Sequence, residues 1–137
     1  MSQETTPKSG ESDRLRKHPT ERFDLAQQLI DLGAAAAELA AEAAATPGRH
    51  RQKTLSRFGN TTVALFHFTA HSTMPEHQTK GSVMIHILDG RMTVRAAGEQ
   101  HDLVAGQILV LAPTVKHDLH APEACRMLLT VHLEAER

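Results

Sequence analysis

The stretch from residue 83 to residue 112, VMIHILDGRMTVRAAGEQHDLVAGQILVLA, decides the fold class of this chain. Apolar and polar residues alternate over short runs, which are separated by Asp89-Gly90, Ala97-Gly98 and Ala105-Gly106. Short alternating runs between Gly-bearing turns are typical of antiparallel strands in sandwiches and barrels. Asp89-Gly90 favours a two-residue hairpin, because both central positions of such a turn need a positive φ.

The same pattern continues on both sides of this stretch. It predicts six short strands, over Thr61–Thr69, Val83–Leu88, Arg91–Ala96, Gln107–Ala112, His117–Ala121 and Cys125–Leu133. Many short strands with turns between them pack as two layers or close into a barrel. We therefore predict an all-β domain over residues 61–134.

A helical pattern precedes these strands. Apolar residues recur at spacings of three and four: Leu25, Leu29, Leu32, Ala36, Leu39 and Ala43. Thr20 can serve as the N-cap, and Pro47-Gly48 provides a stop. These features predict one long Ala-rich α-helix over residues 20–46. Its apolar stripe must be buried, either on the barrel as a lid or against a second chain as a dimer contact.

The remaining segments are polar, and the chain has the length of one domain. Its 137 residues include a Ser-, Thr- and Lys-containing start over residues 1–19, which predicts a disordered tail. Residues 47–60 predict a basic linker, in which Arg49, Arg51, Lys53 and Arg57 are solvated.

Charge and cysteine usage exclude several classes of partner. Fifteen Lys and Arg residues oppose sixteen Asp and Glu residues, so the chain as a whole has no electrostatic footprint for nucleic acid. No uninterrupted apolar run is long enough for a membrane span. Cys125 is the only cysteine, which excludes an internal disulfide and predicts a buried, inert thiol. We predict a cytoplasmic protein with no nucleic-acid or membrane partner.

Two motifs carry a resemblance to a known family. The run Met74–Gly81, followed by Ile87-Leu88-Asp89-Gly90, is similar to the first motif of cupins, a His-bearing turn before a strand and a hairpin. The run Ala105–His117 is similar to the second, a glycine turn and a strand that lead to a histidine. Over residues 63–131 the chain resembles small single-domain bacterial cupins of the type-2, RmlC-like jelly-roll family. The resemblance implies a cupin β-barrel and a homodimer.

The resemblance also implies a metal site inside the barrel. His77 matches the first cupin histidine and His117 the last, whereas Thr79 and Val83 stand where a second histidine and an acid are usual. The implied cofactor is a divalent ion (Zn, Fe, Mn or Ni), which two imidazoles alone would hold with a thin ligand shell. His86 is the nearest recruit in the sequence, but strand alternation places it on the face opposite Val83.

Three functions remain open at this level. The first is a His-lined pocket that binds a divalent metal and a small molecule, with metal-dependent oxygenase or isomerase chemistry. The second is a non-catalytic ligand-binding or sensor module with a degenerate metal site, which dimerises through barrel and helix. The third is a structural dimer. No nucleophile motif or nucleotide fingerprint is present, so no catalytic or cofactor-binding residue is assigned and enzyme status stays open.

Overall fold

The computed structural model describes residues 26–42 and 50–134. The tail predicted over residues 1–19 lies outside them. The described residues form one helix, α2 (Leu32–Ala41), and nine strands: β1 (His50–Phe58), β2 (Thr61–Phe68), β3 (Thr73–His77), β4 (Ser82–Asp89), β5 (Arg91–Ala96), β6 (Glu99–Val104), β7 (Ile108–Leu111), β8 (His117–His120) and β9 (Cys125–His132). The all-β prediction is confirmed. No helix of the described residues is long and apolar enough to cross a membrane.

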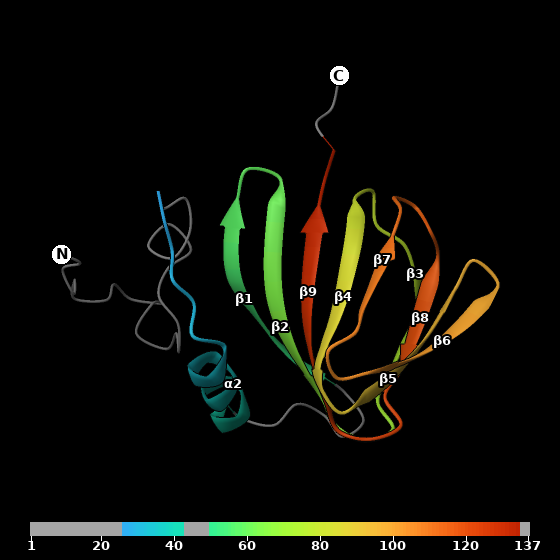
Figure 1. The fold of residues 1–137 in the computed structure, drawn as a ribbon, viewed down its shortest axis with the longest axis horizontal. Coiled ribbons are helices and arrows are strands. Elements are labelled where there is room, and N and C mark those ends of the chain that lie inside the picture. Colours follow the sequence, from blue (N-terminus) through green and yellow to red (C-terminus); the bar gives the residue numbers. More distant parts are fainter. Residues whose placement is uncertain (1–25, 43–49, 135–137) are drawn as a thin grey trace, which may run out of the picture.

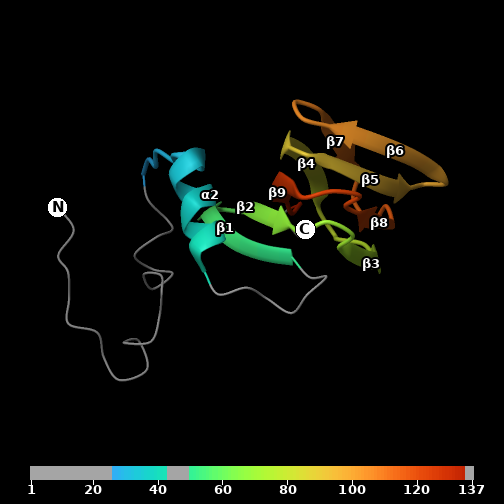
Figure 2. The same cartoon turned by 90° about the horizontal axis from the view of Figure 1, so that it is seen from below.

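Two antiparallel sheets face each other (Figures 1 and 2). The strand order is β1-β2-β9-β4-β7 in the five-stranded sheet and β3-β8-β5-β6 in the other. Alternate side chains from both sheets fill the space between them with a single apolar cluster, centred on Phe68, Ile85, Met92, Val94 and Met127. This is the packing that period-two alternation predicts, because successive side chains on a strand point to opposite faces.

The turn at Asp89-Gly90 is not the predicted hairpin. β4 pairs with β7 and β9, whereas β5 pairs with β6 and β8, so the chain crosses from one sheet to the other at Gly90. Gly90 has φ +79°, and an added Cβ would lie 2.1 Å from the carbonyl oxygen of Ala124. Glycine is needed here for a close backbone approach as well as for its conformation.

A two-residue hairpin lies instead between β5 and β6. Ala96 pairs with Glu99 across the turn, and the residues between them, Ala97 and Gly98, have φ values of 51° and 77°. Positive φ at both positions is the requirement of a type I′ turn. Alanine tolerates this conformation less readily than the Asn or Asp that usually fills the first position, which is why the sequence indicated it less strongly.

The helix is shorter than predicted. α2 has ten residues and begins after Asp31, whose carboxylate accepts a hydrogen bond from the Ala34 backbone N–H at 3.0 Å. Residues 26–31 are not helical, and residues 20–25 and 43–46 lie outside the described chain. The carboxylate of Asp31 satisfies a helix-terminal N–H that a continuing helix would bond internally, so the cap starts the helix here.

The basic linker predicted over residues 47–60 is largely a strand. Residues 50–58 form β1, which pairs with β2 along its length and turns into it at Gly59-Asn60. Its basic side chains meet the helix: Lys53 forms an ion pair with Glu38, and Arg51 donates to the carbonyl oxygens of Ala40 and Glu42. These contacts explain how a charged segment pairs as a strand. β3, which contains Pro75, and the polar β6 were also missed.

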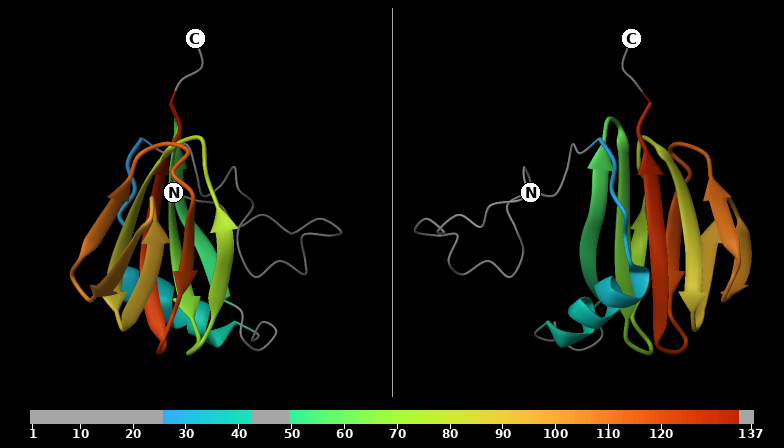
Figure 3. Two further views of the ribbon diagram at one scale, coloured as in Figure 1. Left: turned by 90° about the vertical axis from the view of Figure 1, so that its right-hand side faces the viewer. Right: turned by 60° about the vertical axis from the view of Figure 1, so that its left-hand side comes forward.

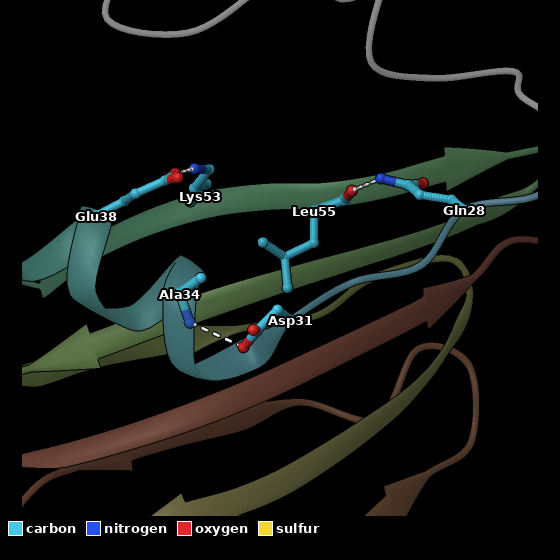
Figure 4. A network of polar contacts seen from close by, with 6 residues as sticks. All are labelled: Gln28, Asp31, Ala34, Glu38, Lys53 and Leu55. Carbon is cyan, nitrogen blue, oxygen red and sulfur yellow. Dashed lines mark hydrogen bonds and ion pairs between the residues drawn. The ribbon is translucent and has the colours of Figure 1, made fainter.

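α2 covers the outer face of the five-stranded sheet rather than the opening between the sheets (Figures 1 and 3). Ala35, Ala36 and Leu39 pack on Leu55 of β1 and Leu65 of β2, and all five side chains are buried. The Gln28 side-chain amide donates to the Leu55 carbonyl oxygen, which fixes the segment before the helix on the same strand (Figure 4). The helix was predicted to pack either on the barrel or against a second chain, and in the structure it packs on the barrel.

Candidate functional site

The two histidines of the cupin motifs meet on neighbouring strands. His77 ends β3 and His117 begins β8, and the two residues are partners in the antiparallel register. Their ring centroids lie 4.2 Å apart, with the ring planes at 60°. His117 is only 4% exposed, whereas His77 is partly buried. A register irregularity in β3 between Met74 and His77 accompanies this pairing.

Both rings are oriented by the backbone in the same way. The Nδ1 atom of His77 lies 2.8 Å from the Pro75 carbonyl oxygen, and that of His117 lies 2.9 Å from the Val115 carbonyl oxygen. A carbonyl oxygen can only accept a hydrogen bond, so in each ring Nδ1 carries the proton and donates it. The Nε2 atoms of both rings have no hydrogen-bond or ion-pair partner among the described residues.

Apolar side chains lie in the segments that carry the pair. The core cluster fills the middle of the barrel, and a set of partly buried residues packs against it: Met74, Leu109, Val115, Leu129 and Val131. Met74 and Val115 belong to the segments that carry His77 and His117. Two imidazoles next to apolar side chains form a combination that is common in small-molecule sites.

The two residues that depart from the cupin motif supply no ligand. The Thr79 hydroxyl donates to the Gly81 carbonyl oxygen at 2.9 Å, so its proton is already engaged. Val83 is 2% exposed and belongs to the core. Neither residue can replace the imidazole or carboxylate that the family places there.

His86 does not join the pair. It lies on β4 opposite Ile108 of β7 and Leu128 of β9. Its neighbours Ile85 and Ile87 point into the core, so the His86 side chain is on the outer face of the sheet. His86 therefore lies on the face opposite Val83, as strand alternation predicted. Its role as a metal ligand stays a prediction.

The donor set does not fit a three-ligand metal centre. Among residues 26–42 and 50–134, no group of three or more His, Cys, Asp or Glu side chains is placed to hold an ion. Catalytic zinc sites and non-haem iron sites use three protein ligands. His77 and His117 could supply two Nε2 ligands, and the remaining coordination positions would fall to water or to another molecule.

Two shallow grooves lie away from the histidine pair. One, of about 490 Å³, is lined by residues of β3, β5 and β8, including Arg95, Asp118 and His120. The other, of about 510 Å³, lies between β6 and the start of β7. Neither groove is lined by His77 or His117, and their mixed polar lining lacks the buried, unpartnered ring nitrogen that distinguishes His117.

Two further titratable groups are perturbed by their surroundings. Burial raises the pKa of the Cys125 thiol to about 11, and the nearby carboxylates of Asp89 and Glu123 add to the effect. The thiol is 1% exposed, as the sequence predicted, and a protonated thiol is a poor nucleophile. Burial also lowers the pKa of His67, helped by Arg51 and Arg126 on the adjacent strands.

Two features were not predicted from the sequence: the contact of the His50 ring with two phenylalanine rings, and the orientation of the histidine pair. His50 begins β1, and its ring lies 5.3 Å from the rings of both Phe66 and Phe68. The contacts of Pro75 and Val115 with the two imidazoles are made by main-chain oxygens. Every residue type carries such an oxygen, so no side-chain pattern in the sequence could have revealed them.

Fold and histidine pair together define a small cupin. The family model of the AraC-like ligand binding domain matches residues 58–137, and the chain belongs to this family. No curated protein matches the chain.

Solved structures share the fold at low sequence identity. A conserved protein of unknown function from Streptococcus pyogenes is 23% identical, with a TM-score of 0.66 and coverage of 84% of this chain and 94% of the other. A cupin superfamily protein from Desulfitobacterium hafniense is 18% identical, with a TM-score of 0.63 and coverage of 82% and 96%. KdgF from Halomonas sp. is 17% identical, with a TM-score of 0.61 and coverage of 68% and 87%.

Proposed function

We propose that this chain is a small-molecule-binding cupin module, in which His77 and His117 are the polar anchor of the ligand. One observation carries the proposal: His117 is 4% exposed, yet its Nε2 atom has no partner among the described residues. Buried polar atoms are nearly always hydrogen-bonded, so an unpartnered one needs an explanation. A bound molecule that pairs with Nε2 provides it, and the matching family is described as a ligand-binding domain.

The module is proposed as a binding or sensing unit rather than an enzyme. Among the described residues, no carboxylate forms a hydrogen bond or an ion pair with His77 or His117, and burial raises the pKa of the Cys125 thiol to about 11. Binding with orientation needs only the two imidazoles as polar contacts. An imidazole can also exchange a proton with a ligand, but a reaction would further need a nucleophile or a metal ion placed against it. The geometry therefore supports binding most directly.

An NMR screen of the full chain tests the proposal. The probes are a library of small organic fragments, with neutral, anionic and cationic members in equal numbers. We expect the hits to shift the backbone amides of Met74 and Val115, which lie in the segments that carry the two histidines. We expect them to be lost in a His117→Ala variant and kept in His86→Ala, the control on the outer face. Hits spread over the surface, or hits unaffected by His117→Ala, would contradict a site at the pair.

A divalent metal at the same pair is the second candidate, with the oxygenase or isomerase chemistry that the resemblance implied. It is favoured by the two Nδ1–carbonyl hydrogen bonds, because metal-binding histidines usually donate their other N–H to a carbonyl or carboxylate. Metal analysis of untagged protein decides it. This candidate predicts stoichiometric Zn, Fe, Mn or Ni in the native chain and loss of the ion in a His77→Ala, His117→Ala double variant. A native chain without metal would exclude it.

A further inference from the structure

We infer that the ligand meets His77 and His117 as a hydrogen-bond donor: it is a small molecule with an apolar body and a hydroxyl or amine group, rather than a carboxylate or phosphate. The inference rests on the proposed function, because it names the chemical class of the molecule that occupies the proposed site. It follows from the proton positions on the two rings and from the groups around them.

The backbone selects the same tautomer in both rings. The carbonyl oxygens of Pro75 and Val115 accept from Nδ1 of His77 and His117, at 2.8 Å and 2.9 Å. A neutral imidazole carries one proton, so a ring that donates from Nδ1 has a lone pair at Nε2. In this neutral form each ring presents an acceptor to its surroundings. Moving the proton to Nε2 would place the Nδ1 lone pair against a carbonyl oxygen and lose the hydrogen bond.

The pair therefore offers two acceptors close together. The ring centroids are 4.2 Å apart, and two Nε2 lone pairs cannot satisfy each other. The same molecule can reach both rings through one group with two protons, such as an amine, or through neighbouring hydroxyls. An anionic oxygen would face two lone pairs and could form a hydrogen bond with neither ring.

Among the described residues, no basic side chain forms a hydrogen bond or an ion pair with His77 or His117. The partly buried residues against the core are apolar, and the Thr79 hydroxyl already donates to the Gly81 carbonyl oxygen. Glu76 and Asp118, the sequence neighbours of the two histidines, line the outer groove with Arg95. An apolar wall with two acceptors selects a ligand that has an apolar body and a donor.

Three compounds of nearly equal shape test this inference on the full chain. They are 4-ethylphenol, which has a donor; 4-ethylanisole, in which a methyl group replaces the phenolic proton; and 4-ethylbenzoate, which is an anion. The titrations are followed by NMR at pH 8 with a chelator present, which removes any divalent ion that would compete for the two Nε2 atoms. We expect the phenol to bind at least about tenfold more tightly than either other compound, since leaving a buried acceptor unpaired is costly.

Two variants test whether the preference for the phenol over the anisole depends on the histidine pair. His117→Ala should remove the difference between phenol and anisole, whereas His86→Ala, the control on the outer face, should retain it. Equal or tighter binding of the anisole or the benzoate to the native chain would overturn the inference and leave the proposed binding function standing.

A second experiment measures which ring nitrogen carries the proton, and it needs no ligand. The ¹⁵N shifts of labelled protein at pH 8, assigned with the His77→Ala and His117→Ala variants, distinguish a protonated ring nitrogen from one with a lone pair. We expect the Nδ1–H form for both residues. An Nε2–H form at His117 would overturn the inference. A screen without any hit at the pair would contradict the proposed function, and the inference about the ligand would fall with it. An Nε2–H tautomer together with hits at the pair would overturn the inference alone.

Discussion

At the scale of single residues, glycine at position 90 is demanded by two independent constraints. The chain changes sheets there with a positive φ, and it passes close to the main chain at Ala124. Gly98 has nearly the same φ, +77° against +79°, but an added Cβ would meet nothing within 4 Å. The two positions therefore separate the cost of the conformation from the cost of the close contact.

Replacing each glycine by alanine should give different losses of stability. Gly98→Ala should lower the free energy of unfolding by about 1–2 kcal/mol, the cost of a left-handed residue with a Cβ. Gly90→Ala should lose clearly more, because its Cβ would overlap the Ala124 carbonyl oxygen, which cannot move without the turn before β9. Urea denaturation of both variants measures the difference. Equal losses would contradict the close approach.

At the scale of elements, α2 is held by its contact with the sheet rather than by its length. A helix of ten residues is marginal alone in water. Leu39 is 1% exposed against Leu55 and Leu65, whereas Leu29, which was assigned to the same stripe, is fully exposed. The sequence placed both leucines on one helical face, but the helix starts only after Asp31 and Leu29 is left outside it.

Two leucine variants test this packing. Leu39→Ala should lower the free energy of unfolding by about 2–5 kcal/mol, since it leaves a cavity between helix and sheet. Leu29→Ala removes the same atoms from an exposed position and should change stability by less than about 0.5 kcal/mol. Thermal or urea unfolding of the two variants provides the comparison. Similar effects of both substitutions would mean that the helix does not rest on β1 and β2 as described.

At the scale of the whole molecule, the five-stranded sheet ends in an exposed apolar strand. β7 pairs only with β4 among the described strands, and its Ile108 and Val110 are 54% and 61% exposed. The strand carries no charge and no proline, the devices that usually protect such an edge. This edge supports the homodimer that the family resemblance implied, which we keep as a proposal.

Sedimentation measurements test the homodimer. We expect the native chain to sediment as a dimer at micromolar concentration, and Val110→Lys to shift it to the monomer by placing a charge on the exposed edge. Val104→Lys is the control, because Val104 is also exposed, at 45%, but ends β6 in the other sheet. A native chain that sediments as a monomer would contradict the proposal.

The sequence by itself determined the all-β class, six of the strands, and the identity of the two motif histidines. These features depend on alternation, turn-forming residues and motif spacing, which are local and can be read from neighbouring letters. The placement of His86 on the outer face followed from the same alternation. The buried Cys125 followed from its apolar neighbours.

Tertiary structure alone decided the rest. The basic residues of β1 find partners on the helix, where Lys53 pairs with Glu38 and Arg51 donates to the Ala40 carbonyl oxygen, and Gly90 passes against the main chain of Ala124. The proton positions on His77 and His117 depend on two main-chain oxygens, and the meeting of the rings depends on the pairing of β3 with β8. These contacts join distant segments or involve the backbone, which every residue carries, so no local pattern of side chains encodes them.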